Sequence, residues 1–128
     1  MAAPGRPTRI LVADDDVLIR AVLRMALSGP DFVVDEAADS NQVVASLIDA
    51  PADLVILDIS MPGDGVEETI ACIQQRAPEA RILVLSGDLE APDSVRSLID
   101  DFARKPIELD DLRSRVSTLL STNEPSTT

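Results

Sequence analysis

Reactive side chains follow four of the five short apolar runs in this sequence. Asp14 and Asp15 come directly after the first run, and Asp58 comes after the third, which reads LVIL. Ser86 follows the fourth run, and Lys105 follows the fifth and weakest. Three acids, a hydroxyl and an amine together are suited to phosphate and divalent-metal chemistry.

The consecutive carboxylates Asp14, Asp15 and Asp16 need a physical explanation because like charges repel. Two carboxylates about 4 Å apart repel by roughly 4 kcal/mol at an effective dielectric near 20. Mg²⁺ typically takes one or two carboxylates together with phosphate oxygens and water. We therefore expect Mg²⁺ among Asp14, Asp15 and Asp58, and we expect Asp16 to be the N-cap of the following helix.

The apolar runs alternate with amphipathic segments along the chain. The runs predict strands at 9–13, 32–35, 54–57, 82–85 and 102–104. Such alternation is typical of repeated βα units around a parallel sheet. In an open α/β sheet, ligands bind beyond the carboxyl ends of the strands. The reactive residues are therefore expected at one edge of the sheet.

Helical patterns occupy the segments between the strands. The second helix begins near Asp39 or Ser40 and ends before Pro51, and a short fourth helix fits residues 94–100. Basic residues are expected on outer faces, namely Arg20, Arg24, Arg113 and Arg115. The residues expected to face inward are Leu18, Ala21, Val22 and Met25 in the first helix; Val43, Val44, Leu47 and Ile48 in the second; Val66, Ile70 and Ile73 in the third; and Leu109, Leu112, Val116 and Leu119 in the last.

Length and composition limit the class of protein. The 128 residues suit a single domain, and a 45% apolar fraction with two aromatic residues predicts an aliphatic core. Against 11 basic residues stand 23 acidic ones, and the resulting charge of −12 disfavours nucleic acid and anionic membranes as direct partners. Cys72 is the single cysteine, which excludes an internal disulfide, and no apolar segment resembles a secretion signal or a membrane span. A cytoplasmic location is expected.

Four motifs resemble the phosphoacceptor receiver domains of two-component response regulators, the family that includes the chemotaxis regulators. The motifs are ILVADDD, DLVILDISMPGDG, ILVLSGD and FARKPI, in the family's order along nearly the whole chain. The resemblance implies a flavodoxin-like, doubly wound α/β fold, with five parallel strands in the order 2-1-3-4-5 and helices on both faces. We expect the receiver domain at 9–121, a disordered tail at 1–8, and a polar tail or linker at 122–128.

The resemblance also implies a role for each matching residue. Asp58 would be the phosphoacceptor, taking a phosphoryl group from a histidine kinase. Mg²⁺ would be bound by Asp14, Asp15, Asp58 and the backbone carbonyl of Ser60. Lys105 would pair with a phosphoryl oxygen and act with Asp58 in the chemistry, where positioning and charge neutralisation matter most.

Further residues would respond to phosphorylation or modulate its lifetime. By the same resemblance the Ser86 hydroxyl would bind another phosphoryl oxygen, Phe102 would be the switch aromatic, and Ser60 and Asp88 would modulate the rate of dephosphorylation. The chain would then be a signalling protein that at most catalyses its own phosphorylation and slow dephosphorylation. Its output would be a switched protein-interaction surface, and homodimerisation is compatible with this role.

Two departures from the family pattern concern the loops beside the site. The loop PGDG after Asp58 is one residue shorter than usual, and the segment from Ser86 to Phe102 is shorter by about three residues. The second departure predicts a stunted fourth helix. We therefore expect partner recognition on another face or on a remodelled fourth helix.

Two other functions remain open from the sequence. The pair Asp14 and Asp16 also fits a haloacid-dehalogenase-like phosphohydrolase, with Asp14 as nucleophile, Asp16 as acid/base, and Ser86 and Lys105 in the later motifs. That function leaves Asp58 without a role. The third possibility is a receiver-like interaction module that is never phosphorylated, and a phosphoryl mimic with Mg²⁺ distinguishes it.

Overall fold

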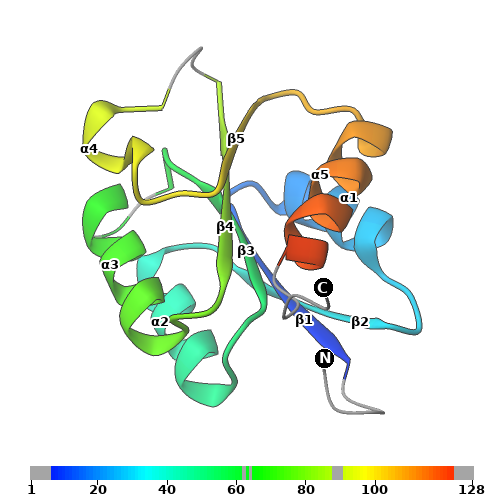
Figure 1. Ribbon diagram of the computed structural model, residues 1–128, viewed down its shortest axis with the longest axis horizontal. Helices are drawn as coiled ribbons and strands as arrows, with labels where there is room; N and C mark the ends of the chain where they lie inside the picture. The colour runs from blue at the N-terminus through cyan, green and yellow to red at the C-terminus, as the bar shows by residue number, and fades with distance from the viewer. Residues whose placement is uncertain (1–6, 62, 64, 88–90, 123–128) are drawn as a thin grey trace.

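Five strands alternate with five helices in the computed structural model, which describes residues 7–61, 63, 65–87 and 91–122 (Figure 1). The predicted domain limits stay a prediction, because most of the two predicted tails lies outside the described residues. No helix in the described ranges is long and apolar enough to cross a membrane. The elements are β1 (Thr8–Ala13), α1 (Val17–Leu27), β2 (Phe32–Ala37), α2 (Ser40–Asp49), β3 (Leu54–Asp58), α3 (Val66–Arg76), β4 (Arg81–Ser86), α4 (Asp93–Arg96), β5 (Asp101–Arg104) and α5 (Leu109–Thr122).

The strands form one parallel sheet in the order β2-β1-β3-β4-β5, which confirms the predicted fold. The register aligns the strand ends. Ala13 of β1 pairs with Leu57 of β3. Asp14 and Asp58, which follow these two residues in the sequence, therefore lie side by side. Ser86 of β4 pairs with Arg104 of β5, which brings Lys105 to the same edge.

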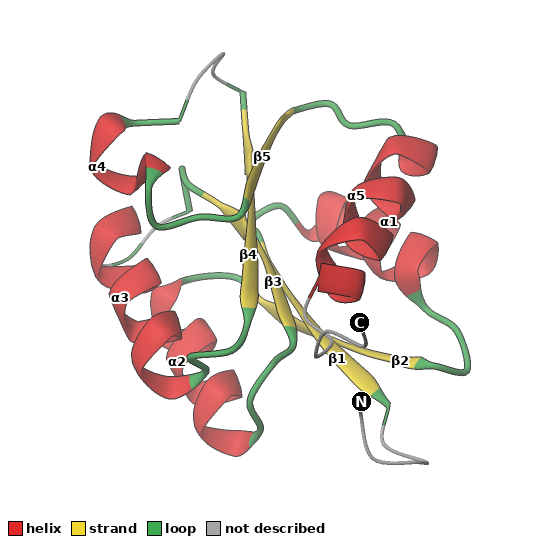
Figure 2. Ribbon diagram, in the orientation of Figure 1, coloured by secondary structure: helices red, strands yellow, loops and turns green. Residues whose placement is uncertain are grey.

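Helices cover both faces of the sheet, with α1 and α5 on one face and α2, α3 and α4 on the other (Figure 2). Strand residues alternate between these layers, because successive side chains of a strand point to opposite faces. The core is aliphatic, as predicted. The layer under α1 and α5 contains Ile10, Val12, Leu54, Ile56, Leu83 and Leu85 from the strands, and the opposite layer contains Leu11, Ala13, Val55, Leu57, Ile82 and Val84.

Acidic N-caps begin the first two helices. The Asp16 side chain accepts hydrogen bonds from the backbone amides of Leu18 and Ile19, and Asp39 accepts one from Gln42. Both caps were predicted, and each satisfies backbone donors that a helix start leaves without an intrahelical partner. The cap at Asp16 also turns the chain directly after the acidic cluster.

The inward face predicted for α1 is wrong. Leu18 and Met25 are 73% and 80% exposed, whereas Leu23 and Leu27 are buried. Nearly every position of α1 except Arg20 and Arg24 is apolar, so the periodicity supports two alternative buried faces. In the structure, Leu23 and Leu27 pack with the strands and with α5 in one core layer. Ala21 and Val22 also lie on the exposed face of this helix, with Leu18 and Met25.

Two side chains also lie on other faces than expected. Arg20 of α1 is only 15% exposed, because it pairs with Glu36 of β2 at 3.0 Å. Leu109, the first residue of α5, is 37% exposed, although it was expected to face inward.

Three smaller expectations also need correction. Ile48 of α2 is 62% exposed, although it was expected to face inward. Arg115 does not simply face solvent, because it pairs with Asp101 of β5 at 2.8 Å. The fourth helix is even shorter than predicted, since it ends at Arg96. The chain then turns toward the sheet, where the backbone amide of Asp100 donates to Ile82.

The corrected rotation of α1 predicts stability effects of very different size for two leucines of one helix. Leu23→Ala should lower the free energy of unfolding by about 2–5 kcal/mol, because it opens a cavity in the core. Leu18→Ala should change it by less than about 0.5 kcal/mol, since Leu18 is exposed. Urea denaturation of both variants measures the difference. A larger loss for Leu18→Ala would restore the face predicted from the sequence.

Candidate functional site

Three carboxylates converge at the carboxyl edge of the sheet. Asp14, Asp15 and Asp58 each offer one oxygen, and these oxygens all lie within 4.8 Å of one another. Asp14 and Asp58 are buried, whereas Asp15 is exposed. The cluster predicted from the strand ends is thus present, with one acid at the solvent boundary.

Backbone and side-chain donors fix the two buried acids. The backbone amide of Asp14 donates to the carbonyl of Ala37 at 3.0 Å, and its Oδ1 accepts from the amide of Asp16 at 2.9 Å. Oδ1 of Asp58 accepts from both the amide and the hydroxyl of Ser60, at 3.0 and 2.8 Å. In each acid Oδ1 takes these contacts, and Oδ2 faces the ammonium of Lys105.

Lys105 supplies positive charge between the buried acids. Its Nζ lies 2.8 Å from Oδ2 of Asp14 and 3.3 Å from Oδ2 of Asp58. Its backbone amide donates to the carbonyl of Ser86 at 2.7 Å, which anchors the residue to the end of β4. Burial alone would lower the pKa of Lys105, but the adjacent carboxylates of Asp14 and Asp58 outweigh it, and the net pKa is raised. The ammonium is therefore charged at neutral pH.

The donor set suits a hard divalent cation. Three carboxylates and one ammonium leave two net negative charges in the cluster. Carboxylate oxygens are the ligands that Mg²⁺ prefers, and the exposed Asp15 leaves room for the waters that this ion retains. The residues that would hold the ion are Asp14, Asp15 and Asp58.

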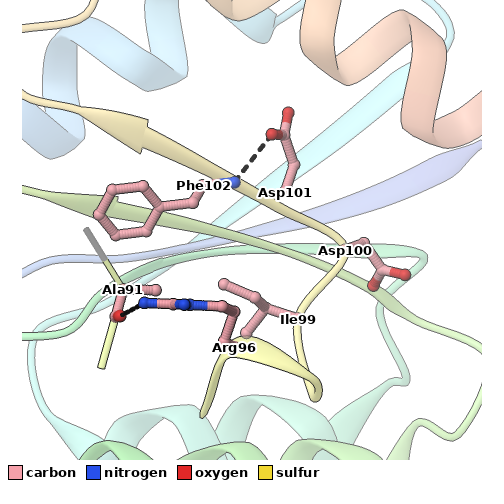
Figure 3. A pocket seen from close by; sticks show the side chains of 6 residues that line it. All are labelled: Ala91, Arg96, Ile99, Asp100, Asp101 and Phe102. Carbon is pink, nitrogen blue, oxygen red and sulfur yellow. Dashed lines mark hydrogen bonds between the residues drawn. The ribbon is translucent and has the colours of Figure 1, made fainter. Parts of the chain in front are cut away.

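The described ones among the remaining predicted site residues lie in β4, in β5 and just after β3. Ser86 is buried at the end of β4, and Ser60 is exposed beside Asp58. Phe102 is half-buried on β5, where it lines a cavity of about 310 Å³ with Ala91, Arg96 and Ile99, among others (Figure 3). Asp88 lies outside the described residues.

Sequence reasoning missed two contributions to the site. It assigned Ser60 a backbone carbonyl ligand, but not the hydroxyl that donates to Asp58. It also found no reactive residue at the end of the second strand, where Glu36 pairs with Arg20 at 3.0 Å. The signal was present, because Arg20 and Arg24 are the basic residues of an otherwise apolar helix, and such residues commonly meet an acid.

Comparison with protein families tests the resemblance seen in the sequence. The family model of the response regulator receiver domain matches residues 10–117, which include Asp14, Asp15 and Asp58. The chain belongs to this family. It is a receiver domain of the kind found in two-component response regulators, as the sequence motifs indicated.

Curated relatives include longer regulators. The receiver domain is 36% identical over 118 residues to the transcriptional regulatory protein ResD of Bacillus subtilis, covering 88% of this chain and 48% of that protein. It is 35% identical over 125 residues to the response regulator MprA of Mycolicibacterium vanbaalenii, covering 93% and 53%. The chain therefore spans about half the length of the curated relatives that it matches.

Solved structures share the fold. The TrrA response regulator of Thermotoga maritima, determined in complex with Mg²⁺ and BeF, is 30% identical, with a TM-score of 0.77 over 88% of this chain and 98% of that one. A CheY-like receiver domain from Methanospirillum hungatei is 24% identical, with a TM-score of 0.83 over 92% and 97%. These likenesses confirm the flavodoxin-like architecture.

The hydrolase alternative is disfavoured by the same geometry. Asp16, its acid/base, caps α1 and accepts hydrogen bonds from the amides of Leu18 and Ile19. It is outside the group of carboxylates that converge on Asp14, whereas Asp58 is inside that group. The acids that the structure brings together are those that the resemblance to receiver domains predicts.

The position of Lys105 predicts a stability effect that Mg²⁺ reverses. Lys105→Met should lower the free energy of unfolding by about 1–3 kcal/mol, because two buried carboxylates lose their counter-charge. Saturating Mg²⁺ should recover most of this loss. Urea denaturation with and without Mg²⁺ measures both effects, and Arg104→Met, at an exposed cation next in the chain, is the control. Equal losses in the two variants would contradict the assigned role.

Proposed function

We propose that this receiver domain accepts a phosphoryl group on Asp58 with Mg²⁺ as cofactor, and that a histidine kinase is the donor. The observation that carries the proposal is the convergence of Asp14, Asp15 and Asp58 within 4.8 Å, with Lys105 bridging the two buried acids. Membership of the receiver family supports the same chemistry. The downstream partner is a protein surface or output domain.

The proposed transfer forms one bond and breaks one. A carboxylate oxygen of Asp58 attacks phosphorus, an O–P bond forms, and the P–N bond to the imidazole of the phosphohistidine breaks with its electron pair leaving on nitrogen. Ser60 orients Asp58, since its amide and hydroxyl both hold Oδ1 and leave Oδ2 toward the cluster. Mg²⁺, when bound, supplies positive charge that offsets the phosphoryl oxygens and the carboxylates.

Lys105 and Ser86 take the polar contacts of the phosphoryl group in this proposal. The ammonium of Lys105 already faces Oδ2 of Asp58 at 3.3 Å, so it lies beside the oxygen that becomes phosphorylated. Ser86 lies at the end of the next strand, with its carbonyl bound to the amide of Lys105. Phe102 is the proposed switch aromatic, and Ser60 and Asp88 are the proposed modulators of dephosphorylation.

Loss of the nucleophile tests the proposal. Asp58→Asn should abolish labelling by acetyl phosphate with Mg²⁺ and should abolish the spectral changes caused by beryllofluoride, which mimics the phosphoryl group. Asp16→Asn is the matched control, because asparagine also caps helices and Asp16 is outside the converging group. Mass spectrometry and NMR provide the two measurements.

Each outcome of that experiment discriminates between functions. A single stoichiometric label lost only in Asp58→Asn supports the phosphoacceptor. Absence of any response in the unmodified protein favours the interaction module that is never phosphorylated. Multiple turnover of a phosphate ester that survives Asp58→Asn but not Asp16→Asn would favour the phosphohydrolase.

The exposed apolar face of α1 is the proposed contact for the kinase. Val17, Leu18, Val22 and Met25 are 47–80% exposed on this face, and α1 begins directly after the acidic cluster. A donor histidine must come within bonding distance of Asp58, so its protein covers the surface that borders the cluster. Exposed apolar side chains at that border favour a protein contact there.

Substitution on this face should separate kinase-dependent from kinase-independent phosphorylation. Leu18→Asp should slow phosphotransfer from the cognate kinase at least tenfold, because it places a charge in the apolar contact. Its labelling by acetyl phosphate should change less than twofold. Ile48→Asp, at an exposed apolar position on the opposite helical layer, controls for added charge. Equal slowing by both variants would contradict the proposed contact.

A further inference from the structure

Arg20 of α1 contacts the acidic segment through its backbone. Nη1 of Arg20 donates to the carbonyl oxygen of Asp14 at 2.7 Å, and only 15% of the arginine side chain is exposed. That carbonyl belongs to the planar peptide unit that joins Asp14 to Asp15. The side chains of Asp14 and Asp15 project from the Cα atoms at the two ends of this plane. A donor fixed on the carbonyl oxygen therefore sets the orientation of the plane and, with it, the starting positions of both carboxylates.

Glu36 of β2 holds the guanidinium of Arg20 in place. Its Oε1 accepts from Nε of Arg20 at 3.0 Å, and its Oε2 accepts from Nη1 of Arg24 at 2.8 Å. The hydrogen bond from Arg24 lowers the pKa of Glu36 most, burial opposes it, and Arg20 lowers it further. The carboxylate is therefore ionised and pairs with both arginines, and its bond to Nε holds the guanidinium of Arg20 in place.

We propose that Arg20, oriented by Glu36, is a positioning residue that preorganises Asp14 and Asp15 for a divalent cation. The proposal rests on the proposed function, because it concerns the same cluster. Arg24 is a suitable control for Arg20, since it also pairs with Glu36 but has no described contact with Asp14 in the structure. Partners that orient metal ligands typically change metal affinity by about 10–100-fold when they are removed.

The sign of the effect separates positioning from simple electrostatics. Removing a nearby positive charge should by itself strengthen Mg²⁺ binding, because the cluster becomes more negative. Loss of positioning should weaken it instead. Arg20→Met keeps the apolar stem of the side chain and removes the donor, and Arg24→Met removes the same charge without touching Asp14.

Two measurements test the proposal. An NMR-monitored titration with Mg²⁺ should give a Kd at least tenfold higher for Arg20→Met and within twofold of the unmodified protein for Arg24→Met. In the metal-free protein, the amide of Asp16, which donates to Oδ1 of Asp14, should exchange hydrogen faster in Arg20→Met alone. Arg20→Lys, which retains one donor group, should fall between the two variants.

Unchanged or tighter Mg²⁺ binding in Arg20→Met would overturn the positioning role, as would equal effects of the two arginine variants. If Arg20→Met does not fold, Arg20→Lys decides by the same two readouts. Absence of Mg²⁺ binding by the unmodified protein would instead overturn the proposed function, and the exchange of the Asp16 amide would still report whether Arg20 fixes the segment.

Discussion

The crowding of carboxylates at one edge of the sheet is the constraint on which the rest of this structure depends. Two unit charges 4.8 Å apart interact by about 3–4 kcal/mol at an effective dielectric near 20, and Asp14, Asp15 and Asp58 make three such pairs. Lys105 reduces the repulsion but leaves two negative charges uncompensated. The cluster therefore carries uncompensated negative charge, and the proposed binding of Mg²⁺ rests on that charge.

The fold tolerates this electrostatic repulsion because aliphatic packing stabilises the strands that carry the cluster. The strands that carry the cluster are buried on both faces by aliphatic side chains, and β3 is buried along its whole length. The strand order places β1 beside β3, so the acids meet without a long loop that would have to be ordered. Lys105 crosses the end of β4 while its backbone is fixed there by the carbonyl of Ser86. Rigid elements thus hold the opposing charges at fixed distances.

Most of the fold and the centre of the site could be predicted from the sequence, because local patterns predict the strands and the site residues. The strand order came from the resemblance to receiver domains. Short apolar runs located the strands, and the residue after each run identified Asp14, Asp58 and Lys105. The rotation of α1 could not be predicted, since an almost wholly apolar helix offers two equivalent faces. The contact of Arg20 with the carbonyl of Asp14 was missed for the same reason, because it depends on that rotation.

The short helix α4 affects where the proposed phosphorylation signal would reach the protein surface. Arg115 of α5 pairs with Asp101 at 2.8 Å and donates to the carbonyl of Phe102 at 3.3 Å, so α5 anchors the backbone of β5. The ring of Phe102 instead borders the cavity beside α4 and packs against the core layer under α2 and α3 (Figure 3). In the proposed function, a change at Lys105, three residues along, therefore meets a fixed backbone and a ring that lies beside the cavity. A four-residue helix offers little surface of its own, so in the proposed function we expect a readout on β5 and α5.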